Sequence, residues 1–216
     1  MSQPVSTELP RVAICLYGHI RAWEKCKKSF LQNMCYFDPK WKSRTNPDYK
    51  NPPNDIVKLN PDIFIHIYSE TDWKKQQSTK YSPDKIKSLF AELNPTEIVV
   101  EECTDDWKKQ RRGESEKYKH LAGMETSEDF VYNMYCYFRK VNLCHQMMKN
   151  YAQRKKISYD IVVSTRPYIM YNHKIDLSAV LRDPSNHQKA RVSPAPDPTD
   201  EWVAGTMSMM DIFAER

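Results

Sequence analysis

Four short apolar runs, separated by longer segments, constrain the fold of this chain more than any other feature. The runs span residues 11–17, 61–69, 96–102 and 159–171. Apolar runs of this length are typical of strands that are buried on both faces of a sheet. Such strands need helices on both sides, so the pattern predicts an α/β fold with a central, mainly parallel sheet flanked by helices.

Helical patterns occupy several of the segments between these runs. Residues 20–34 carry apolar side chains at a loose helical spacing. A second helix is predicted to begin with Ser82 as its N-cap and Pro83 at its first position. The longest helix is predicted from about 127 to 155, with Ser127 as its N-cap and acidic residues in its first turn.

The remaining segments are predicted to be loops, except for a helix at the end of the chain. Residues 38–60 predict a long surface loop with little regular structure, and the strongly polar residues 104–123 predict a mobile segment. Residues 202–216 predict a short strand or turn and then a helix that reaches the end of the chain. We therefore expect residues 1–216 to form a single domain, the N-terminal part of a longer multidomain protein.

Charge and composition narrow the function classes. The chain has 216 residues, of which 40% are hydrophobic, and this is enough for one domain core. Lys and Arg number 33 against 28 Asp and Glu, which gives a net charge of +5. Even the densest basic cluster, residues 108–112, is flanked by acidic residues and is interpreted as a solvated face. The sequence therefore does not predict a nucleic-acid partner.

Cysteine usage and hydropathy bear on the compartment. The six cysteines lie singly, without a CxxC pair. This pattern argues against a zinc site or a disulfide scaffold and predicts free, buried thiols in a reducing compartment. No apolar stretch reaches the roughly 18 residues that a membrane-spanning helix needs, and the N-terminus lacks a signal pattern. We expect a cytoplasmic protein without a membrane span.

The first candidate site follows the first predicted strand, at Leu16, Tyr17, Gly18 and Arg21. A glycine directly after a buried strand lets the backbone approach a ligand closely, and a nearby arginine can reach a diphosphate with its forked donors. The segment is neither a GxGxxG fingerprint nor a P-loop. Ordinary turn chemistry is the alternative interpretation.

Three further candidates lie in or next to the other predicted strands. His66 lies inside the second apolar run, where it is either a core residue or a ligand contact. Glu70 and Asp72 come just after that run, and their oxygens could bind Mg²⁺ or Mn²⁺, although a solvated acidic loop has the same pattern. Arg166 comes just before Pro167, which interrupts the fourth run. An arginine at this strand edge is well placed to meet a phosphate or is a plain surface residue.

The last candidate is an acidic segment near the C-terminus. Asp200 and Glu201 precede Trp202. Carboxylates accept hydrogen bonds from sugar hydroxyls, while an indole covers the apolar side of a sugar ring. A carboxylate here could also deprotonate an acceptor hydroxyl, and we favour Asp200 over Glu201 and Asp211 for that role. An ordinary proline-rich turn is the alternative.

The order and spacing of these segments resemble a known family, the GT-A-fold glycosyltransferases. The family includes enzymes of chloroviruses, large DNA viruses of algae, that glycosylate the viral capsid protein, and the resemblance is to their N-terminal domain. It covers nearly the whole chain from about Arg11 onward. It rests on the long aromatic helix together with the segments VAICLYGHIRAW, PDIFIHIY, YDIVVSTRP and DEWVAGTMSMMDIF.

The resemblance implies a hexosyl or deoxyhexosyl transferase that uses a nucleoside-diphosphate sugar, with UDP as the expected nucleotide. The acceptor would be a glycan or a glycoprotein, in the host cytoplasm if the protein is viral. By position, Gly18 and Arg21 would lie near the donor diphosphate. Arg166 would stand where the family normally carries an acidic DxD motif that holds Mn²⁺ or Mg²⁺.

The chain departs from the family pattern because it contains no DxD motif. Either a cation is held by other carboxylates, such as Glu70 with Asp72, or Asp200, or positive side chains replace the cation as stabilisers of the leaving group. The catalytic candidates are then Asp200 and Arg166. A non-catalytic α/β domain that binds a nucleotide sugar or a nucleic acid remains the alternative function.

Overall fold

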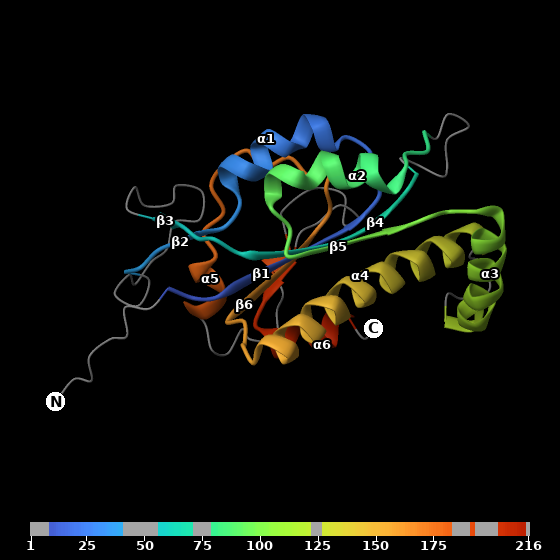
Figure 1. Ribbon diagram of the computed structural model, residues 1–216. Coiled ribbons are helices and arrows are strands. Elements are labelled where there is room, and N and C mark those ends of the chain that lie inside the picture. The colour runs from blue at the N-terminus through green and yellow to red at the C-terminus, as the bar shows by residue number, and fades with distance from the viewer. Residues whose placement is uncertain are drawn as a thin grey trace.

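The computed structural model describes residues 9–40, 56–70, 79–121, 127–182, 191–192 and 203–214. Within these ranges the chain forms a six-stranded sheet with helices on both faces (Figure 1). The predicted α/β architecture with a mainly parallel sheet is therefore confirmed.

The sheet has the strand order β5-β4-β1-β6-β8-β7. Strands β1, β4, β5 and β6 are parallel, whereas β8 runs antiparallel to both of its neighbours. The strands of this sheet are β1 (Val12–Gly18), β4 (Asp62–Tyr68), β5 (Glu97–Glu101), β6 (Ile161–Thr165), β7 (Arg191–Val192) and β8 (Val203–Gly205). A separate antiparallel pair consists of β2 (Tyr36–Phe37) and β3 (Val57–Lys58).

The direction of chain progression reverses at β1. From β1 the chain moves through β4 to β5 on one side, and then returns to β6 on the other side of β1. In open α/β sheets, ligands bind outside the carboxyl ends of the strands at such a switch point. The topology therefore directs attention to the ends of β1 and β6.

The helices follow the predicted pattern closely. Ser82 caps its helix by accepting a hydrogen bond from the backbone N–H of Lys85, and Ser127 accepts one from Phe130. Both predicted N-caps are confirmed. The α-helices are α1 (Trp23–Asn33), α2 (Pro83–Phe90), α3 (Asp105–Ser115), α4 (Glu128–Lys155), α5 (Ser178–Arg182) and α6 (Met207–Ala214), and the 3₁₀ helices are η2 (Ala91–Leu93) and η3 (Glu116–Leu121).

Helices α1 and α2 cover one face of the sheet (Figure 1). Alternate strand residues such as Ile14 and Ile65 point into this core and are almost fully buried. Trp23 of α1 stacks on Phe90 of α2 with ring centroids 4.6 Å apart, and its indole N–H donates to the carbonyl oxygen of Leu89 at 3.0 Å. The two helices are thereby fixed to each other as well as to the sheet.

Helices α4 and α6 cover the opposite face (Figure 1). The intervening strand residues, such as Phe64 and Val162, pack there against Cys144 and Met148 of α4. Successive side chains of a strand thus point into the two cores in turn, as expected for strands that are buried on both faces.

The segment predicted to be mobile over residues 104–123 contains two regular elements, α3 and η3, and its residues 122–123 lie outside the described residues. Thr104 caps α3 by accepting a hydrogen bond from the Trp107 backbone N–H at 3.1 Å, and Asp105 and Asp106 lie in its first turn. The polar composition concealed these helix-start signals. Of the loop predicted over 38–60, residues 41–55 lie outside the described residues.

Two further observations concern the cysteines and the helices. All six cysteines are free and buried, as predicted. Among the helices in the described ranges, none combines the length and the apolar character needed to cross a bilayer.

Candidate functional site

The loop after β1 has an unusual backbone. Gly18 has a φ of 126° and Arg21 a φ of 33°. A side chain on Gly18 would meet no atom within 4 Å, so the glycine is needed for its backbone angle rather than for lack of space. A positive φ at a non-glycine residue costs energy and tends to cluster at functional sites. This backbone directs Arg21 to the carboxyl edge of the sheet, just before α1 begins.

Arg21 and Arg166 meet at this edge on a single aromatic ring. The Arg21 guanidinium carbon lies 4.8 Å from the centroid of the Tyr168 ring, and that of Arg166 lies 5.7 Å from the same centroid. Arg166 also donates a hydrogen bond to the Tyr168 hydroxyl and lies 4.6 Å from the ring centroid of Tyr137 in α4. The strands on either side of the switch point therefore each supply a guanidinium, and aromatic rings hold both in place.

His19 connects this arginine pair to the next strand. Its Nδ1 donates a hydrogen bond to the backbone carbonyl oxygen of Glu70 at 2.9 Å, which fixes the tautomer because a carbonyl can only accept. Burial, and then the positive charges of Lys140, Arg21 and Arg166, lower the pKa of His19 to about 2. His19 is thus a neutral side chain with its Nε2 available as an acceptor.

Glu70 follows β4 and is only 1% exposed. Its Oε1 lies 2.9 Å from Lys108 Nζ and 3.5 Å from Lys80 Nζ. Its Oε2 is buried and has no hydrogen-bond partner in the described part of the chain. The carboxylate is therefore held from one side only, with one acceptor oxygen still to be satisfied.

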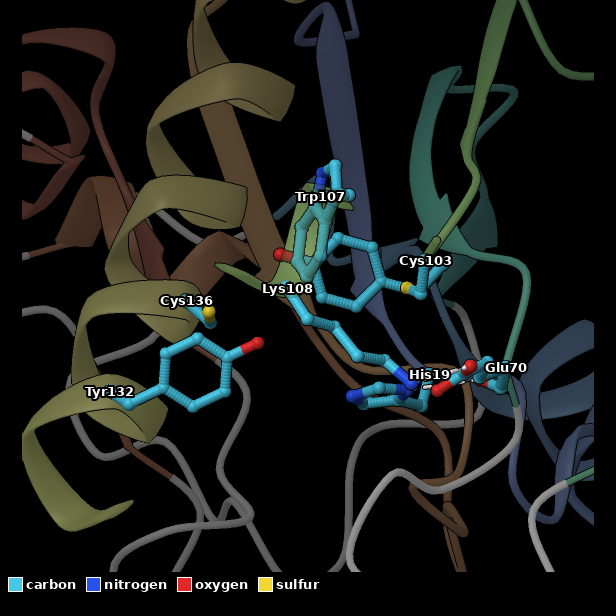
Figure 2. A pocket seen from close by; sticks show the side chains of 8 residues that line it. His19, Glu70, Cys103, Trp107, Lys108, Tyr132 and Cys136 are labelled. Carbon is cyan, nitrogen blue, oxygen red and sulfur yellow. Dashed lines mark hydrogen bonds and ion pairs between the residues drawn. The ribbon is translucent and has the colours of Figure 1, made fainter. Parts of the chain in front are cut away.

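A small cavity lies beside this carboxylate (Figure 2). Figure 2 shows His19, Glu70 and the end of Lys108 gathered on one side, while Tyr132 and Cys136 approach from α4. The cavity volume is about 10 Å³, which is room for about one water molecule. It is lined by His19, Tyr68, Glu70, Cys103, Trp107, Lys108, Tyr132 and Cys136.

Lys140 of α4 brings a buried amine to the same edge. Its side chain points into the protein, it is 5% exposed, and its Nζ lies 3.4 Å from the centroid of the Tyr68 ring. Burial lowers the pKa of Lys140 to about 7. A buried lysine at the carboxyl edge of a parallel sheet is the kind of costly placement that functional sites contain.

Glu101, at the end of β5, closes the polar layer between the sheet and α4. Its carboxylate accepts hydrogen bonds from Arg139 at 2.8 Å and from the Trp107 indole N–H at 3.0 Å. Burial alone would raise the pKa of Glu101, but these two hydrogen bonds, together with the nearby charges of Arg139 and His66, outweigh burial and lower it. His66 Nε2 lies 3.9 Å from the same carboxylate, and burial lowers the pKa of His66 to about 4.

The structure brings some of the predicted site residues together and separates others. Gly18, Arg21, Arg166 and Glu70 share the carboxyl edge, as the parallel strands require. The side chains of Leu16 and Tyr17 belong to the two opposite cores, so a ligand contact from them would have to come from the backbone.

The remaining candidates are buried or not described. His66 faces α4 and does not line the cavity. Asp72 and Asp200 lie outside the described residues. Nor do the residues that the structure describes include a group of three His, Cys, Asp or Glu side chains that could hold a metal ion.

Sequence reasoning missed Lys140, Lys108 and Tyr168. A signal for Lys140 was present, because it stands in a buried stripe at a spacing of four: Cys136, Lys140, Cys144, Met148 and Ala152. A lysine inside an otherwise apolar stripe indicates an inward-pointing charge. The acidic residues that flank Lys108 in the sequence favour a solvated face, and this pattern concealed the contact of Lys108 with Glu70.

Comparisons with known proteins leave this site to be interpreted from its own chemistry. No family model, curated protein or solved structure matches the chain. The site consists of two arginines that contact the same tyrosine ring at a topological switch point, together with a buried carboxylate and a buried lysine.

Proposed function

We propose that the chain is a glycosyltransferase of the GT-A kind. It would transfer a hexosyl or deoxyhexosyl group from a nucleoside-diphosphate sugar, with UDP as the first candidate nucleotide, to a hydroxyl of a glycan or glycoprotein. The observation that carries the proposal is the convergence of Arg21 and Arg166 on Tyr168 at the switch point between β1 and β6. The resemblance of the ordered segments to chlorovirus capsid-glycosylating enzymes supports the same assignment.

The site chemistry suits a diphosphate leaving group. When the bond between the anomeric carbon and the diphosphate oxygen breaks, negative charge grows on that oxygen, and fixed guanidiniums stabilise it without reorganisation. Lys140 adds a further amine near the same edge. The acceptor hydroxyl oxygen forms the new bond to the anomeric carbon. If the reaction inverts that carbon, Asp200 is our candidate for the base that takes the hydroxyl proton.

The described carboxylates at this edge already have cationic or N–H partners. Glu70 is engaged by two lysines and Glu101 by Arg139 and Trp107. The proposed mechanism therefore draws no step through a metal ion and gives leaving-group stabilisation to the cationic side chains. Adding Mn²⁺ in the binding experiment tests this assignment directly.

The first experiment measures nucleotide binding to wild type, Arg166→Ala and Arg166→Lys. UDP, GDP and their common sugar conjugates, each with and without Mn²⁺, are added in a thermal-shift assay, because a ligand that binds only the folded state raises the melting temperature. We expect UDP to stabilise the wild type without Mn²⁺. Loss of the guanidinium in Arg166→Ala should weaken UDP binding by at least about tenfold, with Arg166→Lys in between.

Arg154→Ala is the matched control. Arg154 also lies over a tyrosine ring, that of Tyr151 at 6.0 Å, but at the far end of α4. It should bind UDP like the wild type. If no nucleotide stabilises the protein, or if Arg166→Ala binds as tightly as wild type, the proposal fails. Binding without release of diphosphate in the presence of glycan acceptors would favour the non-catalytic alternative. Steeply salt-dependent binding to oligonucleotides would favour the nucleic-acid alternative.

A further inference from the structure

The arginine pair and Glu70 offer opposite chemistry to a ligand. Arg21 and Arg166 attract an anion, whereas the buried oxygen of Glu70 repels one and accepts hydrogen bonds. His19 joins the two parts, because it follows Gly18 in the arginine loop and binds the backbone of Glu70. A ligand that spans both parts must therefore carry an anionic group next to a group that donates hydrogen bonds.

The unsatisfied oxygen is the observation that points to a ligand. Glu70 lines the cavity and is 1% exposed, and its Oε2 is buried without a hydrogen-bond partner among the described residues. A buried acceptor without a partner is costly, so native proteins rarely leave one unsatisfied. The cavity volume of about 10 Å³ admits about one hydroxyl-sized group.

The lysines determine which Glu70 oxygen is available. Lys108 and Lys80 both approach Oε1, so they hold the carboxylate in orientation while Oε2 remains for the ligand. In Figure 2 the dashed contact from Lys108 meets Glu70 beside the ring of His19. Lys108 is thus a positioning residue in this arrangement.

We propose that Glu70 and its cavity form a hydroxyl-recognition subsite of the donor pocket, which accepts a hydroxyl of a neutral sugar and disfavours an acidic sugar. The proposal rests on the proposed function, because it takes the anion on the arginines to be the diphosphate of a nucleotide sugar. A sugar carboxylate brought to the same place would face a second carboxylate instead of donating to it, which is a discrimination by repulsion.

The experiment measures dissociation constants by calorimetry for UDP, UDP-glucose, UDP-galactose, UDP-xylose and UDP-glucuronate. Wild type should bind at least one neutral UDP-sugar more tightly than UDP, and prefer it over UDP-glucuronate by about tenfold, the size of one hydrogen bond to a charged group. In Glu70→Gln and Glu70→Ala this preference should fall to within about threefold. UDP itself should bind all variants alike, which shows that each variant is folded.

Glu92→Gln is the matched control, since it also removes a carboxylate that pairs with a lysine, Lys27 at 3.1 Å, but Glu92 does not line the cavity. It should retain the wild-type preference for a neutral sugar. If Lys108→Met loses the preference while Glu70→Gln keeps it, recognition belongs to the lysine and the proposal is overturned. Tighter binding of UDP-glucuronate than of every neutral sugar by wild type overturns it too.

The binding results distinguish a failure of the Glu70 subsite from a failure of the proposed function. If UDP binds the wild type but the Glu70 variants keep the wild-type sugar preference, or if no sugar adds to the affinity of UDP, the subsite is wrong and the diphosphate site stands. If UDP does not bind the wild type at all, the proposed function fails, and the subsite fails with it.

Discussion

The two halves of α4 press against the same sheet but meet it with different chemistry. Toward the amino ends of the strands, Met148 and Ala152 pack against apolar neighbours. Toward the carboxyl ends, Lys140 and Cys136 face a layer of polar and aromatic side chains that includes Tyr68. The inward stripe of both halves is almost fully buried, so the difference lies in the chemistry of the buried atoms.

We expect this difference to separate stability from ligand binding within one helix. Burying apolar side chains stabilises the fold in proportion to the area removed from water. Burying a charge costs free energy unless good partners surround it. The apolar half is therefore expected to contribute most of the stability that α4 provides, and the polar half is expected to give up some stability in return for a preorganised site.

The largest expected effect comes from Met148→Ala in the apolar half. Met148 is completely buried, and its truncation leaves a cavity that should lower the free energy of unfolding by about 2–5 kcal/mol. Urea denaturation measures this loss. Under conditions where the variant is folded, its affinity for UDP should stay at the wild-type value. A large loss of UDP affinity in the folded variant would show that the two halves are not separable.

The second prediction concerns Lys140→Met in the polar half. Replacing the buried amine by an apolar chain of similar length should stabilise the protein at pH 7 by a few kcal/mol, about 1.4 kcal/mol for each unit by which burial lowers the pKa, while weakening UDP binding. The folded-state pKa of Lys140 is about 7, against its ordinary value of 10.5. Below pH 7 the lysine is charged in both states and its cost is fully present. Between these two pKa values the unfolded state binds more protons than the folded state, so the free energy of unfolding of the wild type increases with rising pH.

The stability advantage of Lys140→Met over wild type should therefore shrink as the pH rises from 7 toward 10. Urea denaturation of both proteins at several pH values measures this advantage. In the difference between their free energies of unfolding, the contributions of most other titrating groups cancel. The groups that interact electrostatically with Lys140 are His19, His66, Glu101, Cys103, Cys136 and Arg166. An advantage that is constant over this pH range would contradict the prediction.

The smallest expected effect is that of Tyr17→Phe, at the boundary between the two halves. The Tyr17 hydroxyl lies 3.4 Å from the hydroxyl of Tyr137, a long hydrogen bond. Removing it should cost about 1 kcal/mol or less of unfolding free energy and leave the affinity for UDP within about twofold of wild type. A strong loss of UDP binding would instead make the Tyr17 side chain a direct ligand contact.

The elements of this protein follow from local patterns in its sequence. The apolar runs placed β1 and β4 within a residue or two, and Ser82 and Ser127 marked the beginnings of α2 and α4. These strands and helix starts can be predicted from the sequence, because burial on both faces and helix capping depend on residues that are close together in the chain. The parallel sheet also implied that Gly18 and Arg166 would share an edge, since parallel strands end on the same side.

Only the tertiary structure decided what surrounds each of these residues. The ring that receives Arg21 and Arg166, the lysines that hold Glu70, and the buried position of Lys140 combine elements far apart in the sequence. Electrostatic neighbours and cavities depend on distances of a few ångströms between such elements, and local periodicity carries no information about them. The sequence alone therefore determined where β1 and β4 end, and the packing of α3 and α4 against the strand ends decided the chemistry of the site.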